Sequence, residues 1–378
     1  MIRRMEINNI ILLAIAIPSF LCGFYFLYRI KLCRDYNLNS SNQKIAIIIP
    51  ARNEEHNIGN LLSSIKQQTY KVDEVIVVND SSTDSTKEVA ESLGAIVLES
   101  AQLPEGWKGK PWACWQGAQF SSSDVFIFLD ADTIIEPARL KNIVDSYLFE
   151  LQESEKSNGV VMSIAPFHKI EKLYEELSAI FNIIMVGSMN AFTPFKSNQP
   201  TGLYGQSLIV SKKNYFEIEG HSSVKNKILE NVFMAQKFQE KGTRLVCLGG
   251  KGSLSFRMYP DGFRALIDGW TKAFASGAGQ ASLSALLTSI LWISAGFIIS
   301  IALLFNLFVG DSVILWLILY VAYSLQTYWM LRRLGSFSFL TALLFPVNLV
   351  FYVIVFSRSL YYLISKKSIN WKSRNVNS

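Results

Sequence analysis

The run from Val125 to Leu129 consists of five apolar residues, and Asp130, Ala131 and Asp132 follow it directly. A short run of aromatic and β-branched residues is typical of a buried strand. If the extended spacing continues past Leu129, the two carboxylates point to the same side, roughly 7 Å apart. Two neighbouring anions favour a divalent cation, Mg²⁺ or Mn²⁺, with positions left for phosphate oxygens. Acidic pairs are also common in solvated turns, so the choice between a metal site and a solvated turn depends on the surrounding sequence.

Further apolar runs precede the acidic pair, and helical patterns alternate with them. Pro50 is expected to end the first strand, and Gly94 to end the second helix. Asp84 or a neighbouring Ser or Thr can cap that helix. The alternation predicts an open α/β sheet of the doubly wound, Rossmann-like class. The expected strands are Ile45–Ile49, Val75–Val78 and Ala95–Leu98, and the expected helices are Ile58–Ile65 and Ser85–Leu93.

Polar clusters follow three of the predicted strands, at Pro50–Glu54, Asn79–Asp84 and Asp130–Asp132. Ligands of such sheets bind beyond the carboxyl ends of the strands. Asp80 can accept hydrogen bonds from a nucleobase or a ribose, and Arg52 can approach a base or a phosphate. The sequence holds neither G-x-G-x-x-G nor G-x-x-x-x-G-K-[ST], so it has no glycine-rich phosphate loop. A diphosphate would then be held by a metal ion at the acidic pair.

These three clusters resemble the nucleotide-sugar motifs of glycosyltransferase family 2, which are inverting enzymes of the GT-A fold. The resemblance covers residues 44–275. It implies that Pro50, Arg52, Glu54 and Asp80 bind the donor. The stretch that begins at Gly109-Lys110 is similar to the family's Gly-Lys-x-x-Ala loop. The resemblance also places Lys110 near the donor's phosphates or base, and makes Asp130 and Asp132 the metal ligands.

The family usually has a Glu-Asp pair at the start of a later helix, and the second residue is its catalytic base. Here that place reads Glu230-Asn231. An amide cannot take up a proton at neutral pH. Either Glu230 is the base, or the reaction hardly needs one. The second case fits a carboxylate acceptor, because a carboxyl group is already ionised at neutral pH.

Two further cations are candidates for the site. Arg257 and Lys272, with Trp270 between them, could stabilise the departing diphosphate or an acceptor carboxylate. Anchoring at a membrane interface is the competing interpretation for these residues. His221, which follows Gly220, is a candidate acceptor contact or a plain loop histidine.

The composition indicates a membrane protein, because 50% of the residues are hydrophobic and only 17% are charged. Ile7–Leu27 is long enough to span a bilayer and lacks a convincing cleavage site. The cations Arg29, Lys31 and Arg34 follow it, so residues 1–34 are expected to form a signal anchor with the catalytic domain in the cytoplasm.

Residues 282–364 are expected to form two to three further spans, from apolar stretches at 282–309, 313–331 and 337–364. Pro346 can break the last stretch and produce a re-entrant segment. That would return the basic tail, residues 365–378, to the cytoplasm.

The formal charge of +6 suits an anionic membrane surface. The sequence shows no basic groove with interleaved aromatic residues, so nucleic acid is not an expected partner. The four cysteines are scattered without a C-x-x-C motif, and neither a zinc site nor a disulfide framework is indicated.

Within the family, four segments resemble the membrane-bound enzymes that glycosylate carotenoids, and the likeness runs nearly end to end. The segments are Trp107–Gly117, Phe181–Met185, Phe256–Tyr259 and Gly269–Lys272. The resemblance implies UDP-glucose as donor and the carboxylate of a C30 carotenoid, diaponeurosporenoate, as acceptor. A glycosyl ester would be the product, made at the plasma membrane, with an acyltransferase or an oxidase of the carotenoid pathway as partners.

Three alternatives stay open. The acceptor could be another lipid, such as a hopanoid, a polyprenyl phosphate or a diacylglycerol. A processive polysaccharide synthase would be expected to carry Gln-x-x-Arg-Trp, whereas the sequence around Arg257 lacks both the Gln and the Trp. A non-enzymatic transporter or scaffold would not need acidic residues at strand ends. A coupled transporter would be expected to carry acidic residues within its membrane segments, and the last three apolar segments hold essentially none.

Overall fold

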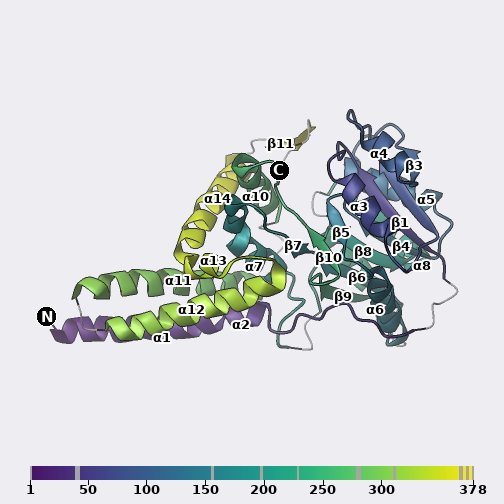
Figure 1. Ribbon diagram of the computed structural model, residues 1–378. Coiled ribbons are helices and arrows are strands. Elements are labelled where there is room, and N and C mark those ends of the chain that lie inside the picture. Colours follow the sequence, from purple (N-terminus) through teal and green to yellow (C-terminus); the bar gives the residue numbers. More distant parts are fainter. Residues whose placement is uncertain are drawn as a thin grey trace. The chain divides into compact units, whose positions relative to one another are not determined.

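The computed structural model describes residues 2–38, 43–154, 157–195, 199–227, 230–277, 282–309, 312–365, 369–371 and 374–376. The chain forms two compact units (Figure 1). The α/β unit consists of Lys31–His168 and Gln199–Arg257. The apolar-helix unit consists of Met1–Ile30, Lys169–Asn198 and Met258–Ser378. Residues 366–368, 372–373 and 377–378 of the expected basic tail at 365–378 lie outside the described residues.

A seven-stranded mixed sheet forms the centre of the α/β unit, with the strand order β3-β2-β1-β4-β8-β6-β9. β8 runs antiparallel to both of its neighbours, β4 and β6, and the other pairs are parallel. The strands are β1 (Ile45–Ala51), β2 (Glu74–Asn79), β3 (Ile96–Glu99), β4 (Val125–Leu129), β6 (Val160–Ala165), β8 (Ser207–Ser211) and β9 (Arg244–Gly249).

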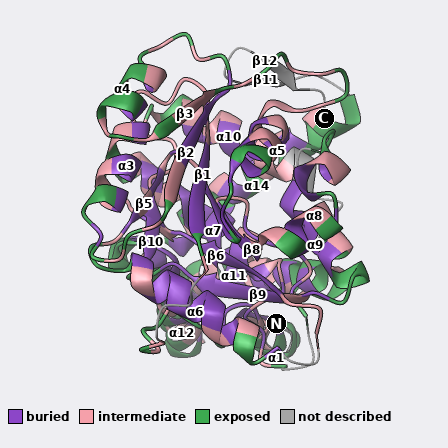
Figure 2. Cartoon of the chain, turned by 90° about the vertical axis from the view of Figure 1, so that its right-hand side faces the viewer, coloured by how far each residue is buried: buried purple, intermediate pink, exposed green. Residues whose placement is uncertain are grey.

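Helices cover both faces of this sheet, which explains the continuous apolar runs in its strands. The odd-numbered isoleucines of β1 pack with α3 and α6 in one core, which is buried throughout (Figure 2). On the other face, Ile48 lies against Gly117 of α5. The helices of the unit are α3 (Ile58–Lys66), α4 (Thr86–Ser92), α5 (Gly109–Phe120), α6 (Leu140–Gln152), α8 (Lys212–Glu217), η2 (Gly220–Val224) and α9 (Glu230–Glu240).

The four strands and two helices predicted from the sequence are present within one or two residues of the expected bounds. The Asp84 side chain accepts the Thr86 N–H at 3.1 Å at the start of α4, as expected. Pro50 does not end β1, which continues to Ala51. Pairing of β1 with β4 ends at Ile48, so the missing Pro50 N–H falls beyond that ladder.

A second, three-stranded sheet has the order β5-β10-β7. β10 (Leu254–Phe256) pairs with β5 (Thr133–Ile135) on one side and with β7 (Phe167–His168) on the other. Gly250 lies in the turn before β10, and its N–H donates to the Ala165 carbonyl at 2.7 Å. The small sheet thereby fixes the chain that leaves the acidic pair.

Within the described residues, four helices of the second unit are long and apolar enough to cross a membrane: Asn9–Phe26, Leu283–Val309, Val313–Leu334 and Phe345–Ser365. The final apolar stretch is broken between Leu343 and Phe345, just before Pro346, where the sequence predicted a break. The helices of this unit are α1 (Ile2–Leu21), α2 (Gly23–Phe26), η1 (Leu173–Ser178), α7 (Ala179–Gly187), α10 (Phe263–Gly277), α11 (Leu283–Val309), α12 (Val313–Leu334), α13 (Phe339–Leu343) and α14 (Phe345–Ser365).

Polar side chains of α12 bind backbone carbonyls at the C-terminal ends of α1 and α2. Gln326 accepts a hydrogen bond from the Trp292 indole at 2.8 Å and donates to the Phe20 carbonyl at 3.1 Å. Arg333 donates to the Leu27 carbonyl at 2.6 Å. Carbonyls at a helix end have no partner within the helix, so these side chains satisfy them in an apolar setting.

Two stretches that fall inside the expected domain 44–275 belong to the apolar-helix unit: Lys169–Asn198 and the start of Met258–Ser378. Trp270 of α10 shows why. Its ring is fully buried, stacks on Phe181 with centroids 4.8 Å apart, and donates to Ser178 at 3.0 Å. An aromatic core of its own holds α10 and α7 together.

Candidate active site

The acidic pair does not continue the extended spacing of β4. The Asp130 carbonyl accepts the Thr133 N–H at 3.1 Å and the Thr133 hydroxyl at 2.7 Å, which closes a tight turn. The expectation of strand-like spacing is therefore wrong, because this local hydrogen bonding turns the chain towards β5. The Asp130 N–H donates to the Gln206 carbonyl at 3.1 Å, so a second segment fixes the turn.

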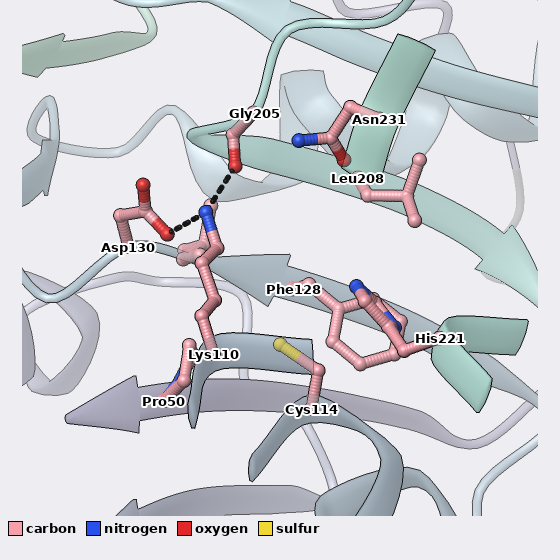
Figure 3. Close-up of a pocket in the computed structure, with 10 residues that line it drawn as sticks. Pro50, Lys110, Cys114, Phe128, Asp130, Gly205, Leu208, His221 and Asn231 are labelled. Atoms are coloured by element: carbon pink, nitrogen blue, oxygen red, sulfur yellow. Dashed lines mark hydrogen bonds and ion pairs between the residues drawn. The ribbon is translucent and has the colours of Figure 1, made fainter. Parts of the chain in front are cut away.

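Lys110, in the first turn of α5, lies at the centre of the candidate site (Figure 3). Its Nζ is 2.7 Å from Asp130 Oδ1 and 3.3 Å from Glu230 Oε1. It also donates to the Gly205 carbonyl at 2.9 Å. Burial would lower the pKa of Lys110, but Asp130 and Glu230 outweigh it, and the pKa stands above the usual range of a lysine. The site thus holds a permanent cation between two carboxylates.

A small cavity lies beside this cluster, and Asn231 forms part of its wall. The Asn231 amide donates to Glu230 Oε1 at 3.3 Å. A Cβ atom on Gly205 would be 2.7 Å from Asn231 Nδ2, so a larger residue there would push the Asn231 amide aside. The cavity is lined by Pro50, Lys110, Cys114, Phe128, Leu129, Asp130, Gly205, Leu208, His221 and Asn231.

His221 is a buried residue of the cavity wall, and not a plain loop histidine. Its Nδ1 is hydrogen-bonded to the Tyr215 hydroxyl at 2.8 Å, and its ring packs edge-on against Phe128. Burial, together with the charge of Lys110, lowers the pKa of His221 to about 3. The imidazole is therefore neutral at physiological pH.

The two loops that follow β1 and β2 are joined by hydrogen bonds. Arg52 donates to the Asp80 carbonyl at 2.7 Å, and the Glu54 N–H donates to the Thr86 hydroxyl at 2.8 Å. Asn53 has a positive φ of 52°, and its side chain accepts the Thr83 N–H at 2.9 Å. Asp80 is buried at the end of β2. The two predicted donor-binding motifs therefore form one structural unit at the carboxyl edge of the sheet.

Comparisons with known proteins agree with this geometry. The model of the family described as "Glycosyl transferase family 2" matches residues 46–233. The 4,4'-diaponeurosporenoate glycosyltransferase of Staphylococcus aureus strain N315 is 33% identical over 370 residues, which are 96% of each chain. The chain belongs to glycosyltransferase family 2. It is therefore an enzyme that transfers a glycosyl group, and its α/β unit is of the GT-A type.

Other similar proteins were found as well. The enzyme of the same name from S. aureus strain USA300 is also 33% identical over 96% of each chain. Among solved structures, glucosyl-3-phosphoglycerate synthase from Mycobacterium tuberculosis, in complex with Mn²⁺, UDP and glucosyl-3-phosphoglycerate, is 20% identical. The structural match covers 64% of this chain and 80% of the synthase chain, with a TM-score of 0.41.

The donor atoms of the acidic turn fit a hard divalent cation, because Asp130 and Asp132 offer carboxylate oxygens. In the described ranges, no three His, Cys, Asp or Glu side chains gather at one point. A cation bound by these two residues would take its other ligands from water or from substrate oxygens. That arrangement suits an ion that binds together with a diphosphate.

The remaining predicted cations lie in different units of the glycosyltransferase. Arg257 follows β10 directly and belongs to the α/β unit, whereas Lys272 lies in α10 of the apolar-helix unit. Trp270 between them is part of the packing of α10, and not an exposed ring. The roles of Arg257 and Lys272 stay predictions.

Sequence reasoning did not single out two parts of this site. Gly205 contributes its backbone carbonyl and the space left by its missing side chain. A single glycine in a sequence predicts neither. Tyr215 is fully buried under His221. The Tyr215–His221 spacing of six residues, between two short helices, matches no periodic pattern.

His221 should make the stability of the enzyme pH-dependent. The unfolded chain binds this proton near pH ~6.5, whereas the folded chain binds it only near pH 3. The free energy of unfolding should therefore fall as the pH falls through this window, by at most about 1.4 kcal/mol per pH unit. Above the pKa of the unfolded chain, the contribution of His221 to the free energy of unfolding is fully present. Thermal unfolding of detergent-purified protein at pH 7 and pH 5 measures it.

Substitution of His221 by Gln should reduce the loss of Tm between pH 7 and pH 5. His56→Gln is the matched control, because its side chain is 88% exposed, and it should leave the pH dependence unchanged. An equal loss of Tm in His221→Gln and in the wild type would contradict the assignment.

Proposed function

We propose that this enzyme is an inverting, metal-dependent hexosyltransferase that moves glucose from UDP-glucose to a membrane-dissolved lipid. The proposed acceptor is the carboxylate of a C30 carotenoid, diaponeurosporenoate, and the product is a glycosyl ester. The observation that carries the proposal is the end-to-end match to enzymes named for this acceptor, which includes the apolar helices. A likeness confined to the α/β unit would speak only for the donor.

The proposed donor site lies at the carboxyl edge of the sheet. Asp130 and Asp132 would hold a divalent cation, which, when bound, offsets the negative charge that grows on the departing diphosphate. Lys110 would donate to the same phosphate oxygens, because its ammonium is already fixed beside Asp130 at 2.7 Å. Pro50, Arg52, Glu54 and Asp80 would bind the nucleoside part, and Arg257 and Lys272 stay candidates for the diphosphate or the acceptor.

The acceptor carboxylate would attack the anomeric carbon in line, on the face opposite the leaving UDP. An ionised carboxylate brings its own electron pair, so no proton has to be removed. This supports a carboxylate acceptor, because Glu230 is the only acid of its pair and both Lys110 and Asn231 contact its Oε1. A hydroxyl acceptor would need a free base, which commonly contributes about 10²–10⁴-fold.

Glu230→Gln separates these two possibilities. With a carotenoid carboxylate, we expect kcat to fall by about tenfold or less, because the substitution loosens Lys110 but removes no essential base. Initial rates at saturating donor and acceptor measure it, with Asp132→Ala as the comparison. A loss in Glu230→Gln as deep as that in Asp132→Ala would mean that Glu230 is indispensable.

Radiolabelled UDP-glucose tests the whole proposal. Membranes that hold the enzyme and the carotenoid acid should transfer label into the lipid extract, and EDTA should stop the transfer. Mild alkali should release the label, because an ester is labile where a glycosidic ether is not. An alkali-stable labelled lipid would instead favour a hopanoid or another hydroxyl acceptor that has no esters of its own. A glucosylated diacylglycerol would release its label as glucosylglycerol, whereas the proposed sugar ester would release it as free glucose.

We also propose that the enzyme lies in the plasma membrane with its catalytic unit in the cytoplasm. Arg29, Lys31 and Arg34 follow the first candidate span, and Arg332 and Arg333 end α12. UDP-sugars are made on that side. A tag at Ser378 that is accessible only after sealed cells are opened would support a cytoplasmic C-terminus.

A further inference from the structure

The ammonium of Lys110 has three N–H groups, and three acceptors surround it. They are Asp130 Oδ1 at 2.7 Å, the Gly205 carbonyl at 2.9 Å and Glu230 Oε1 at 3.3 Å. The three acceptors come from the end of β4, the segment before β8 and the start of α9. Because the three partners belong to different elements, the ammonium is held in one place.

In this position Lys110 contacts the carboxylate of Asp130, which the proposed cation also needs as a ligand. A divalent ion binds a carboxylate oxygen at about 2.0–2.6 Å. At Asp130 it would lie within a few ångströms of Lys110 Nζ, and like charges at that distance repel each other. Lys110 and the cation therefore cannot both hold Asp130 without a cost.

A diphosphate removes this conflict. Its oxygens can ligate the cation on one side and accept hydrogen bonds from an ammonium on the other. Glu230 would keep Lys110 near the site if Asp130 bound a cation, because its Oε1 is a second anionic contact at 3.3 Å. Asn231 donates an N–H to Glu230 and adds no negative charge, so Glu230 is the one carboxylate of the Glu230-Asn231 pair.

We propose that Lys110 competes with the divalent cation for Asp130, so that the cation binds tightly only together with a nucleoside diphosphate. This inference rests on the proposed function. It assigns Lys110 a second role besides a contact with the donor's phosphates. Free divalent ions would be kept out of the site, and the loaded sugar donor would bring its own ion.

Mn²⁺ binding to the full-length protein in detergent micelles tests the inference without any turnover. Electron paramagnetic resonance of unbound Mn²⁺ gives the affinity, with Mn²⁺ alone and with saturating UDP. In the wild type, UDP should tighten Mn²⁺ binding by about tenfold or more. In Lys110→Met, Mn²⁺ alone should bind about tenfold tighter than in the wild type, and the effect of UDP should shrink.

Two variants serve as controls. Lys108→Met removes a positive charge from the same loop and leaves the three contacts of Lys110 in place, so it should bind Mn²⁺ as the wild type does. Lys110→Arg keeps the charge and should keep Mn²⁺ binding weak without UDP. If Lys110→Met does not fold, Lys110→Gln replaces it, because an amide can still donate to the Gly205 carbonyl.

Unchanged or weaker binding of Mn²⁺ alone in the neutral variants would overturn the competition. The proposed function fails by a different result, namely Mn²⁺ and UDP binding that is the same in Asp130→Asn and in the wild type. The two failures can therefore be told apart in one set of titrations.

Discussion

Asp130→Asn should lower the rate of glycosyl transfer by about 10²–10³-fold. The substitution keeps the size of the side chain and removes its charge, so the turn closed by Thr133 stays intact while the cation loses a ligand. Lys110 also loses the closer of its two anionic contacts, at 2.7 Å. Initial rates with radiolabelled UDP-glucose and a carotenoid acid in micelles measure the loss.

Asp124→Asn is the matched control for this prediction. Asp124 precedes the same strand at its opposite end, is exposed, and accepts the Lys44 N–H at 2.9 Å. Its substitution should leave the rate within about twofold of the wild type, because surface changes cost little. A rate for Asp130→Asn within tenfold of the control would remove Asp130 from the proposed site.

Gly250→Ala should destabilise the α/β unit by about 3 kcal/mol or more. A Cβ atom at this position would lie 2.4 Å from the Leu254 carbonyl, 2.6 Å from the Ala165 carbonyl and 2.8 Å from the Phe167 nitrogen. All three are backbone atoms, so the strands themselves would have to move. β10 would then shift, and β5 and the acidic turn that leads into it would shift with it.

The variant is tested by the yield of folded protein and its Tm, followed by the transfer rate of whatever accumulates. Gly252→Asn, two residues later in the same turn, is the control. Gly252 has a φ of 75° and open space around its Cβ position, and asparagine tolerates such a φ. A Tm for Gly250→Ala equal to that of this control would show that the turn adapts.

The sheet could be predicted because its evidence is local. Each of β1, β2 and β4 is a short apolar run that ends in a polar cluster, and parallel strands bring those ends to one edge. Lys110 and Glu230 came from the family resemblance and not from periodicity. The structure brings both to Asp130, which lies 20 residues from one and 100 from the other along the chain.

The parts that could not be predicted depend on contacts between distant segments. Lys110 and the Gly205 carbonyl are 95 residues apart, and no sequence pattern predicts which backbone carbonyl accepts a hydrogen bond from a distant lysine. The extended spacing expected for the acidic pair failed because Thr133 supplies a closing hydrogen bond that a D-x-D pattern does not contain. The grouping of α7 with α10 depends on the Phe181–Trp270 stack, which joins residues far apart in the sequence.

The hydrogen bonds that Gln326 and Arg333 send to Phe20 and Leu27 have a practical consequence. Shortening the protein at its amino terminus, the usual route to a soluble enzyme, would deprive the Gln326 amide and the Arg333 guanidinium of these carbonyl acceptors. The leading helix is thus an architectural member of the bundle and no detachable tether. A truncated chain should precipitate or be degraded where the intact one can be purified.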